Sequence, residues 1–207
     1  MARKTNTANA ARAEPFHLVG GRLALDFANT ADWADGIGSG KESGPRGDTI
    51  DREHLQSPAD LERWVHAAGL TGLAGITDDD ALAGIRGFRE HVRNILLSAL
   101  DDRPADEAAR HAVGAALEDA GAGTPLARAA ATSRADGTVA LKAALAVSAL
   151  ALLIDRHEID RVKMCEGSDC GWLFVDESRG RNRRWCRMET CGNRAKARRH
   201  YRARSGT

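Results

Sequence analysis

Four cysteines, the only ones in the chain, follow the pattern C-x4-C-x15-C-x4-C near its C-terminus. The first pair is Cys165 and Cys170, and the second pair is Cys186 and Cys191. Two such pairs can bring four thiolates to the corners of a tetrahedron, the arrangement of structural zinc sites. We therefore predict that these residues bind one structural zinc ion. Disulfides in an exported protein and an iron–sulfur cluster are the alternatives for the same ligands.

The segment around the cysteines is strongly basic. Residues 161–207 hold 13 Lys and Arg against 5 Asp and Glu, a net charge of +8. The first 160 residues hold 17 against 24, a net charge of −7. Two units of opposite charge suggest two separate tasks. Because a basic unit attracts polyanions, the segment predicts contact with nucleic acid.

The basic residues after Cys191 are spread around a predicted terminal helix. A helix that is polar on nearly all sides does not form a core, but in a groove lined by phosphates its charge is neutralised and counterions are released. Arg and Asn side chains can also read guanine and adenine. A solvated basic tail is the alternative. The residues that we expect to contact nucleic acid are Arg183, Arg184, Asn193, Arg194, Lys196, Arg198, Arg199 and Arg202.

The elements that position these residues are predicted to be mainly helical, because Ala and Leu supply most of the apolar side chains. We expect a flexible arm over residues 1–14, a helical domain over 15–160 and the zinc finger, ending in a basic helix, over 161–207. The expected helices begin at Pro58 with Ser57 as N-cap, after Thr77 as N-cap (running to Leu100), at Arg103-Pro104, and at Val139 (running to His157).

Three further segments carry weaker signals. The segment Leu23 to Ala28 is apolar enough for a short strand or a first helical turn. The segment Asp32 to Ile50, rich in Gly, Asp and Ser, predicts a long surface loop. The tripeptide Ala135 to Gly137 is typical of a hairpin turn between two short strands.

Asp26 and Asn29 are polar residues within an otherwise apolar segment. They can line a ligand pocket bordered by Trp33 and Trp64. Alternatively, they cap a helix and satisfy backbone groups. The sequence leaves both interpretations open.

Two motifs resemble known families. W-L-F-V-D-E-S-R from Trp172 to Arg179, followed by R-R-W-C-R-M-E-T-C-G-N-R-A-K from Arg183 to Lys196, resembles the CGNR zinc finger. L-D-F-A-N-T from Leu25 to Thr30 resembles the start of the ABATE domain that usually precedes this finger. The resemblance implies a bacterial, stress-linked transcription regulator that binds DNA, in which the four cysteines are the zinc ligands.

We therefore expect a DNA-binding regulator whose N-terminal domain senses a small-molecule effector or forms a homodimer. An enzyme is not expected, because no phosphate loop, nucleophile elbow or carboxylate pair is found. RNA binding and a redox-sensitive zinc or protein-interaction module are the alternatives. No export signal and no apolar run of about 20 residues is present, so we expect a cytoplasmic protein without a membrane partner.

Overall fold

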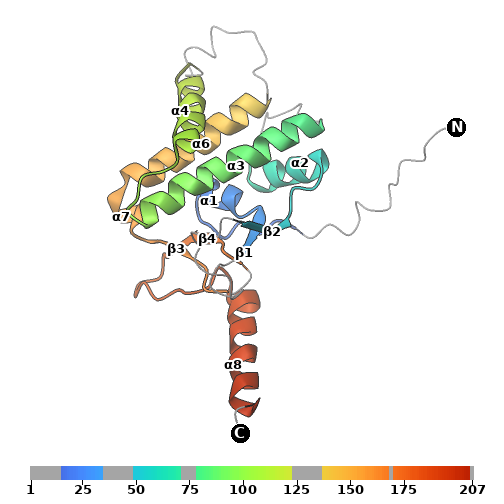
Figure 1. Ribbon diagram of the computed structural model, residues 1–207, viewed down its shortest axis with the longest axis vertical. Helices are drawn as coiled ribbons and strands as arrows, with labels where there is room; N and C mark the ends of the chain where they lie inside the picture. The colour runs from blue at the N-terminus through green and yellow to red at the C-terminus, as the bar shows by residue number, and fades with distance from the viewer. Residues whose placement is uncertain (1–14, 35–48, 71–77, 123–136, 168–169, 206–207) are drawn as a thin grey trace, which may run out of the picture.

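The structure of the protein is a computed structural model that describes residues 15–34, 49–70, 78–122, 137–167 and 170–205. Three long helices pack with shorter ones into one body, two short hairpins lie beside it, and the terminal helix projects away (Figure 1). In chain order the elements are α1 (Leu23–Ala28), β1 (Ala31–Ala34), β2 (Thr49–Glu53), α2 (Pro58–Ala67), α3 (Asp79–Leu100), α4 (Glu107–Ala122), α6 (Gly137–Ile154), α7 (Arg156–Ile159), β3 (Val162–Met164), β4 (Leu173–Val175), η2 (Met188–Gly192) and α8 (Asn193–Ser205).

The mainly helical fold that ends in a four-cysteine unit and a basic helix is confirmed. Helix α2 starts as predicted. The Ser57 hydroxyl accepts the Asp60 N–H at 3.3 Å, and the Asp60 carboxylate accepts the Ser57 N–H at 2.8 Å. This reciprocal capping box, with Pro58 at the first helical position, satisfies N–H groups that the helix itself cannot pair.

Helix α3 is capped by Asp78, so the predicted N-cap is wrong. The Asp78 carboxylate accepts the Ala81 N–H at 2.7 Å. Thr77 lies outside the described residues. Asp is the stronger N-cap residue, and its negative charge also suits the positive end of the helix dipole. The predicted end of this helix at Leu100 is confirmed.

Helix α4 begins at Glu107 and not at Arg103-Pro104. The preceding residue, Asp106, is tied to α3: its N–H donates to the Asn94 side chain at 3.0 Å, and the Asn94 amide donates to its carboxylate at 2.7 Å. This long-range clamp sets the start of α4, and local sequence cannot reveal it.

The apolar helix expected from Val139 to His157 is α6, which packs against α1, α3 and α4. It ends at Ile154 because Asp155 caps the short α7, accepting the Glu158 N–H at 3.1 Å. By length and composition alone α6 could cross a membrane, a test that core helices also pass, and 33% of it is buried.

The strands are not where the sequence suggested. The ends of the expected loop from Asp32 to Ile50 form β1 and β2, which pair antiparallel with a register shift after Asp32. Gly137, expected in a hairpin turn, begins α6, because the apolar Ala- and Leu-rich run that follows favours a helix. The predicted arm (1–14) and residues 35–48 and 123–136 lie outside the described residues.

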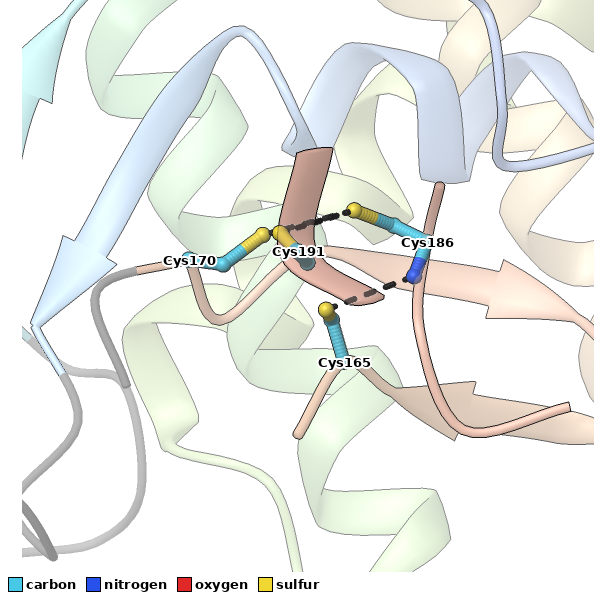
Figure 2. A group of neighbouring side chains, drawn as sticks. All are labelled: Cys165, Cys170, Cys186 and Cys191. Carbon is cyan, nitrogen blue, oxygen red and sulfur yellow. Dashed lines mark hydrogen bonds between the residues drawn. The ribbon is translucent and has the colours of Figure 1, made fainter. Parts of the chain in front are cut away.

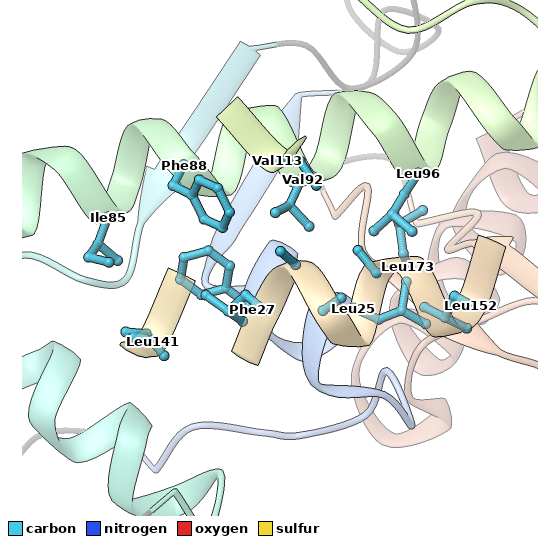
Figure 3. Close-up of a cluster of buried hydrophobic side chains, with 14 of the residues drawn as sticks. Leu25, Phe27, Ile85, Phe88, Val92, Leu96, Val113, Leu141, Leu152 and Leu173 are labelled. Carbon is cyan, nitrogen blue, oxygen red and sulfur yellow. The ribbon is translucent and has the colours of Figure 1, made fainter. Parts of the chain in front are cut away.

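The buried core joins the N-terminal helices to the C-terminal segment. The segment Leu23–Ala28, for which the sequence allowed a strand or a helical turn, is the helix α1. Its Leu25 and Phe27 are fully buried between α3 and α6. Figure 3 shows Leu173 among the side chains of α1, α3 and α6. Leu173 and Val175 of β4 belong to this same core cluster. The four-cysteine unit therefore extends into the core of the helical body through β4, while its cysteines and Phe174 form a second buried cluster.

A Leu173→Ala variant tests this shared core. Loss of a fully buried leucine should destabilise the folded state by about 2–5 kcal/mol. Because the core is shared, urea unfolding followed by helical circular dichroism and by zinc release should shift together. Unfolding of the cysteine unit alone, with the helical signal unchanged, would contradict a common core.

Candidate zinc centre and nucleic-acid interface

The four cysteine sulfurs converge from separate elements, as Figure 2 shows. Cys165 follows β3, Cys170 precedes β4, Cys186 follows a long loop, and Cys191 lies within η2. All four are buried, and their sulfurs lie within 4.8 Å of one another. The Sγ–Sγ distances are 3.5 Å for Cys170–Cys186 and 3.6 Å for Cys186–Cys191. A tetrahedral zinc site with bonds of about 2.3 Å has sulfur–sulfur edges of roughly 3.8 Å, so the cluster fits the ion.

Hydrogen-bond donors surround the sulfurs. The backbone N–H groups of Gly167 and Cys186 donate to the Cys165 sulfur at 3.4 and 3.3 Å. The Arg194 guanidinium lies 3.3 Å from the Cys191 sulfur. Donors that contact metal ligands in this way orient them and stabilise their negative charge.

The four neighbouring thiols influence one another's ionisation. Hydrogen bonds from the other sulfurs lower the pKa of Cys191, and Arg194 lowers it further. Hydrogen bonds to the other three sulfurs, with burial, raise the pKa of Cys170. Four thiolates this close cannot all be charged without a compensating cation, which a zinc ion supplies.

A glycine follows the second cysteine of each pair. Gly171 has φ +59°, and a Cβ there would lie 2.7 Å from the Cβ of Trp33. A Cβ on Gly192 would lie 2.4 Å from the Met188 sulfur and 2.7 Å from the Trp185 ring. The N–H of Gly192 donates to a backbone carbonyl in the loop. Close packing therefore explains the glycine at position 192.

The first cysteine turn is bonded directly to the N-terminal domain. The backbone N–H of Trp33 donates to the Cys170 carbonyl at 3.1 Å. The Trp172 indole N–H donates to the Ala31 carbonyl at 3.0 Å. Arg93, buried in α3, donates to the Gly171 carbonyl at 2.9 Å, and its guanidinium lies 4.2 Å from the centre of the Trp33 ring. These contacts fix the orientation of the zinc centre relative to the helices.

Asn29 belongs to the same set of contacts. Its amide donates to the Leu173 carbonyl, and its carbonyl accepts the Leu173 N–H, each at 2.8 Å. Asn29 therefore satisfies buried backbone groups of β4, and it also lines the groove that Asp26 lines.

A second buried arginine on α3 is hydrogen-bonded to β2. The sequence did not indicate this role. Arg89 is fully buried on α3 and forms two hydrogen bonds with the Glu53 carboxylate, at 2.8 and 2.6 Å. It also donates to the Thr30 hydroxyl at 3.1 Å. Its position on the apolar stripe of α3 is the only sequence signal for this role.

Asp26 lines a groove of about 940 Å³ between the helical body and the cysteine unit. Trp64 and Trp172 also line it, together with the cysteine ligand Cys170. The indole N–H of Trp64 is fully buried without a hydrogen-bond partner. Trp33 does not border the groove and packs against Gly171 instead. The groove is therefore where the predicted pocket residue and the zinc centre meet.

The two arginines before Cys186 have different surroundings. Arg183 is half-buried: it donates to the carbonyls of Trp185 and Cys186 and stacks 4.3 Å from the centre of the Phe174 ring. These contacts hold the Arg183 guanidinium against the cysteine unit. Arg184 is exposed, pairs with Glu166 and lies over the Trp185 ring.

The remaining predicted contacts lie on α8. Its first residue, Asn193, is exposed, and its amide donates to the Glu189 carbonyl of η2 at 3.1 Å. Arg194, Lys196 and Arg199 are exposed, whereas Arg198 is half-buried. Arg202 lies on the same helix, and its side chain lies outside the described part of the chain. Cys191 and Asn193 thus connect the zinc centre to the basic helix without an intervening loop.

The fold and the site define a zinc-finger protein with a helical N-terminal domain. Residues 21–156 match the ABATE family, described as "Putative stress-induced transcription regulator", and residues 161–204 match the CGNR zinc finger. The chain belongs to the ABATE family, and its four cysteines form the structural zinc site of a CGNR finger. No curated protein matches the chain.

An Asp26→Asn variant tests the environment of the groove. Burial raises the pKa of Asp26 from 3.8 to about 6, although the Gly20 N–H opposes this shift. As pH rises from 3.8 to about 6, the unfolded chain loses this proton and the folded chain retains it, so the folded state is progressively destabilised. We expect the variant to melt at a higher temperature than the wild type at pH 8. The difference should vanish below pH 3.8, and a gap that is independent of pH would contradict a buried carboxyl.

Proposed function

We propose that this protein is a DNA-binding transcription regulator, in which zinc fixes α8 as the DNA-contacting helix. The observation that carries the proposal is the position of α8. It leaves the zinc centre directly after Cys191 and projects from the body of the protein (Figure 1). Its 13 residues span about 20 Å, a length that suits the major groove of DNA, which is about 12 Å wide.

The charge of α8 supports this proposal. The helix holds no acidic residue, and basic side chains extend along it from Arg194 to Arg204. Such a helix gains little from packing on a protein core, whereas phosphate contacts release counterions. The ligand Cys191 and the Arg194–Cys191 contact anchor its first turn, so a loaded zinc site holds the arginines in a fixed orientation.

The surroundings of the aromatic residues favour duplex DNA over single-stranded RNA. Recognition of unpaired bases needs exposed rings for stacking. Phe174 is fully buried, Trp172 faces the N-terminal domain through its bond to Ala31, and Trp185 is covered by Arg184. Tyr201 is the finger aromatic that is largely exposed, at 70%. Competition between duplex DNA and RNA for the zinc-loaded protein distinguishes the two partners.

A redox-sensing role has less support, because the four cysteines are between 2% and 4% exposed and oxidants react fastest with accessible thiolates. Zinc release by peroxide at low dose would favour it. As a proposed regulator, the protein would act by binding DNA and not by catalysis.

A double variant, Lys196→Gln with Arg199→Gln, tests the DNA surface. Both side chains are exposed, so the fold should tolerate the change. The slope of log affinity against log salt is negative, and each lost phosphate contact makes it shallower by about 0.9, so the pair should make it shallower by about 2. Fluorescence anisotropy with duplex DNA over a salt series measures this slope.

Arg110→Gln provides the matched control, because Arg110 is exposed on α4 of the helical body. It removes one positive charge without touching α8, and its slope should equal that of the wild type. Equal slopes for the wild type, the control and the double variant would refute DNA binding through α8.

The groove beside Asp26 supports a sensing role for the N-terminal domain. A bound molecule would touch the helical body through Asp26 and the finger through Arg194. Native mass spectrometry of the purified protein should therefore show a small molecule that is lost in Asp26→Leu. Spectra that contain only zinc and protein, for both the wild type and the variant, would count against sensing in this groove.

A further inference from the structure

Helix α6 carries an exposed apolar face that neither the core nor the finger uses. Within the described part of the chain, seven large apolar residues are exposed, and four of them lie on α6. These four are Val139 (41% exposed), Val147 (49%), Leu150 (41%) and Ile154 (73%). An apolar cluster of this kind on a folded domain marks an interaction surface.

The spacing of these residues places them on one side of the helix. At 100° per residue, Val139, Val147, Leu150 and Ile154 fall within an arc of about 80°. Most of the residues that α6 buries in the core fall on the opposite side, among them Leu141, Leu145, Ala149 and Leu152, whereas the small, buried Ala146 borders the exposed face. The intervals from Ala143 through Val147 and Leu150 to Ile154 are four, three and four residues, the spacing of a helix–helix seam.

The chemistry of the face excludes a charged partner. Lys142 is the only charged residue of α6, and its ammonium group lies 5.9 Å from the centre of the Phe88 ring on α3. The exposed face therefore offers neither ion pairs nor attraction for nucleic acid or an acidic peptide. Its partner must be apolar and of matching shape.

The sizes of the side chains along the seam match a second copy of α6 in reverse orientation. Ala140 and Ala143 lie near the start of the helix, and Leu150 and Ile154 lie near its end. In an antiparallel pair centred on Val147, the small residues of one helix face the large residues of the other, which keeps the packing even. Such a two-fold contact uses the same surface on both copies.

We propose that the exposed face of α6 is a self-association surface, on which a second copy of this chain packs its own α6 antiparallel about Val147. This dimer would add a second DNA-binding helix to the proposed regulator, on which the inference rests for its biological role. The observations on α6 do not depend on DNA binding. In Figure 1, α8 projects from the opposite end of the molecule, so pairing through α6 leaves both basic helices uncovered. One finger buries only about 600–1,000 Å² on DNA, and two fingers would read paired half-sites.

The area of the exposed face of α6 determines how strongly two copies should associate. The 18 residues of α6 span about 27 Å, and one helix pair of that length buries less than the roughly 800 Å² per partner of a standard interface. We therefore expect a weak dimer whose population rises with protein concentration, and a DNA duplex carrying two sites should strengthen it.

Sedimentation velocity of the full-length, zinc-loaded protein, without DNA, tests the proposal. The wild type should shift from monomer to dimer as its concentration rises to the millimolar range. Val147→Glu and Leu150→Glu should each remain monomeric. Val147→Glu would bury two facing carboxylates at the two-fold axis, and Leu150→Glu would bury a carboxylate against the small residues near the start of the partner helix. Ala83→Glu, an exposed position on α3, is the matched control and should dimerise like the wild type.

A cross-linking experiment tests the orientation. Zinc-loaded Ala140→Cys and Ile154→Cys proteins, mixed and oxidised, should form the mixed disulfide in preference to either homodimer. Preferential cross-linking of two Ile154→Cys chains to each other would show a parallel arrangement and overturn the proposed geometry.

Three outcomes overturn the self-association surface: a wild type that stays monomeric at every concentration, a dimer that survives Leu150→Glu with native helical content and zinc, or a wild type that instead binds phosphatidylcholine vesicles through this face. A failure of DNA binding is separable. Leu150→Glu should keep the salt slope of a single finger, whereas the Lys196→Gln and Arg199→Gln variant should still dimerise.

Discussion

The hydrogen bond from the Arg93 guanidinium to the Gly171 carbonyl joins the zinc finger to the long helix α3. The bond forms only if the chain turns at Gly171 with φ +59°, close against Trp33, and this turn directly follows the zinc ligand Cys170. Zinc coordination and core packing therefore depend on the same few backbone atoms. A small metal unit on a flexible linker would be free of this constraint, because its metal would stabilise only itself.

This connection determines what zinc does in the protein. The ion holds Cys191 at the start of α8, and the Cys170 turn holds the same ion against the helical body. The direction of α8 is thus fixed relative to α3. A change at the groove beside Asp26 can reach the basic helix through a few bonded contacts, which is the physical basis for the proposed coupling of sensing to DNA binding.

Local patterns in the sequence were sufficient for part of this structure. Cysteine spacing predicted the zinc ligands, and the Ser57-Pro58 pair predicted the start of α2, because each signal lies within a short stretch of chain. The buried roles of Arg89 and Arg93, and the place of Leu173 in the main core, depend on partners far away in sequence. The one local sign of such a partner is a basic residue within the apolar stripe of a helix. The misplaced hairpin has the same origin: Ala-Asp-Gly favours a turn locally, and the apolar run after Gly137 favours helix packing.

Hydrogen exchange before and after removal of zinc by a chelator tests most directly whether finger and helices form one unit. If the Arg93–Gly171 bond and the shared core join them as described, zinc loss should reduce the protection of amides in β1, in β4 and in the middle of α3 around Arg93, as well as near the cysteines. Loss of protection confined to residues 161–205, with α3 and β1 as protected as in the zinc-bound protein, would contradict the account.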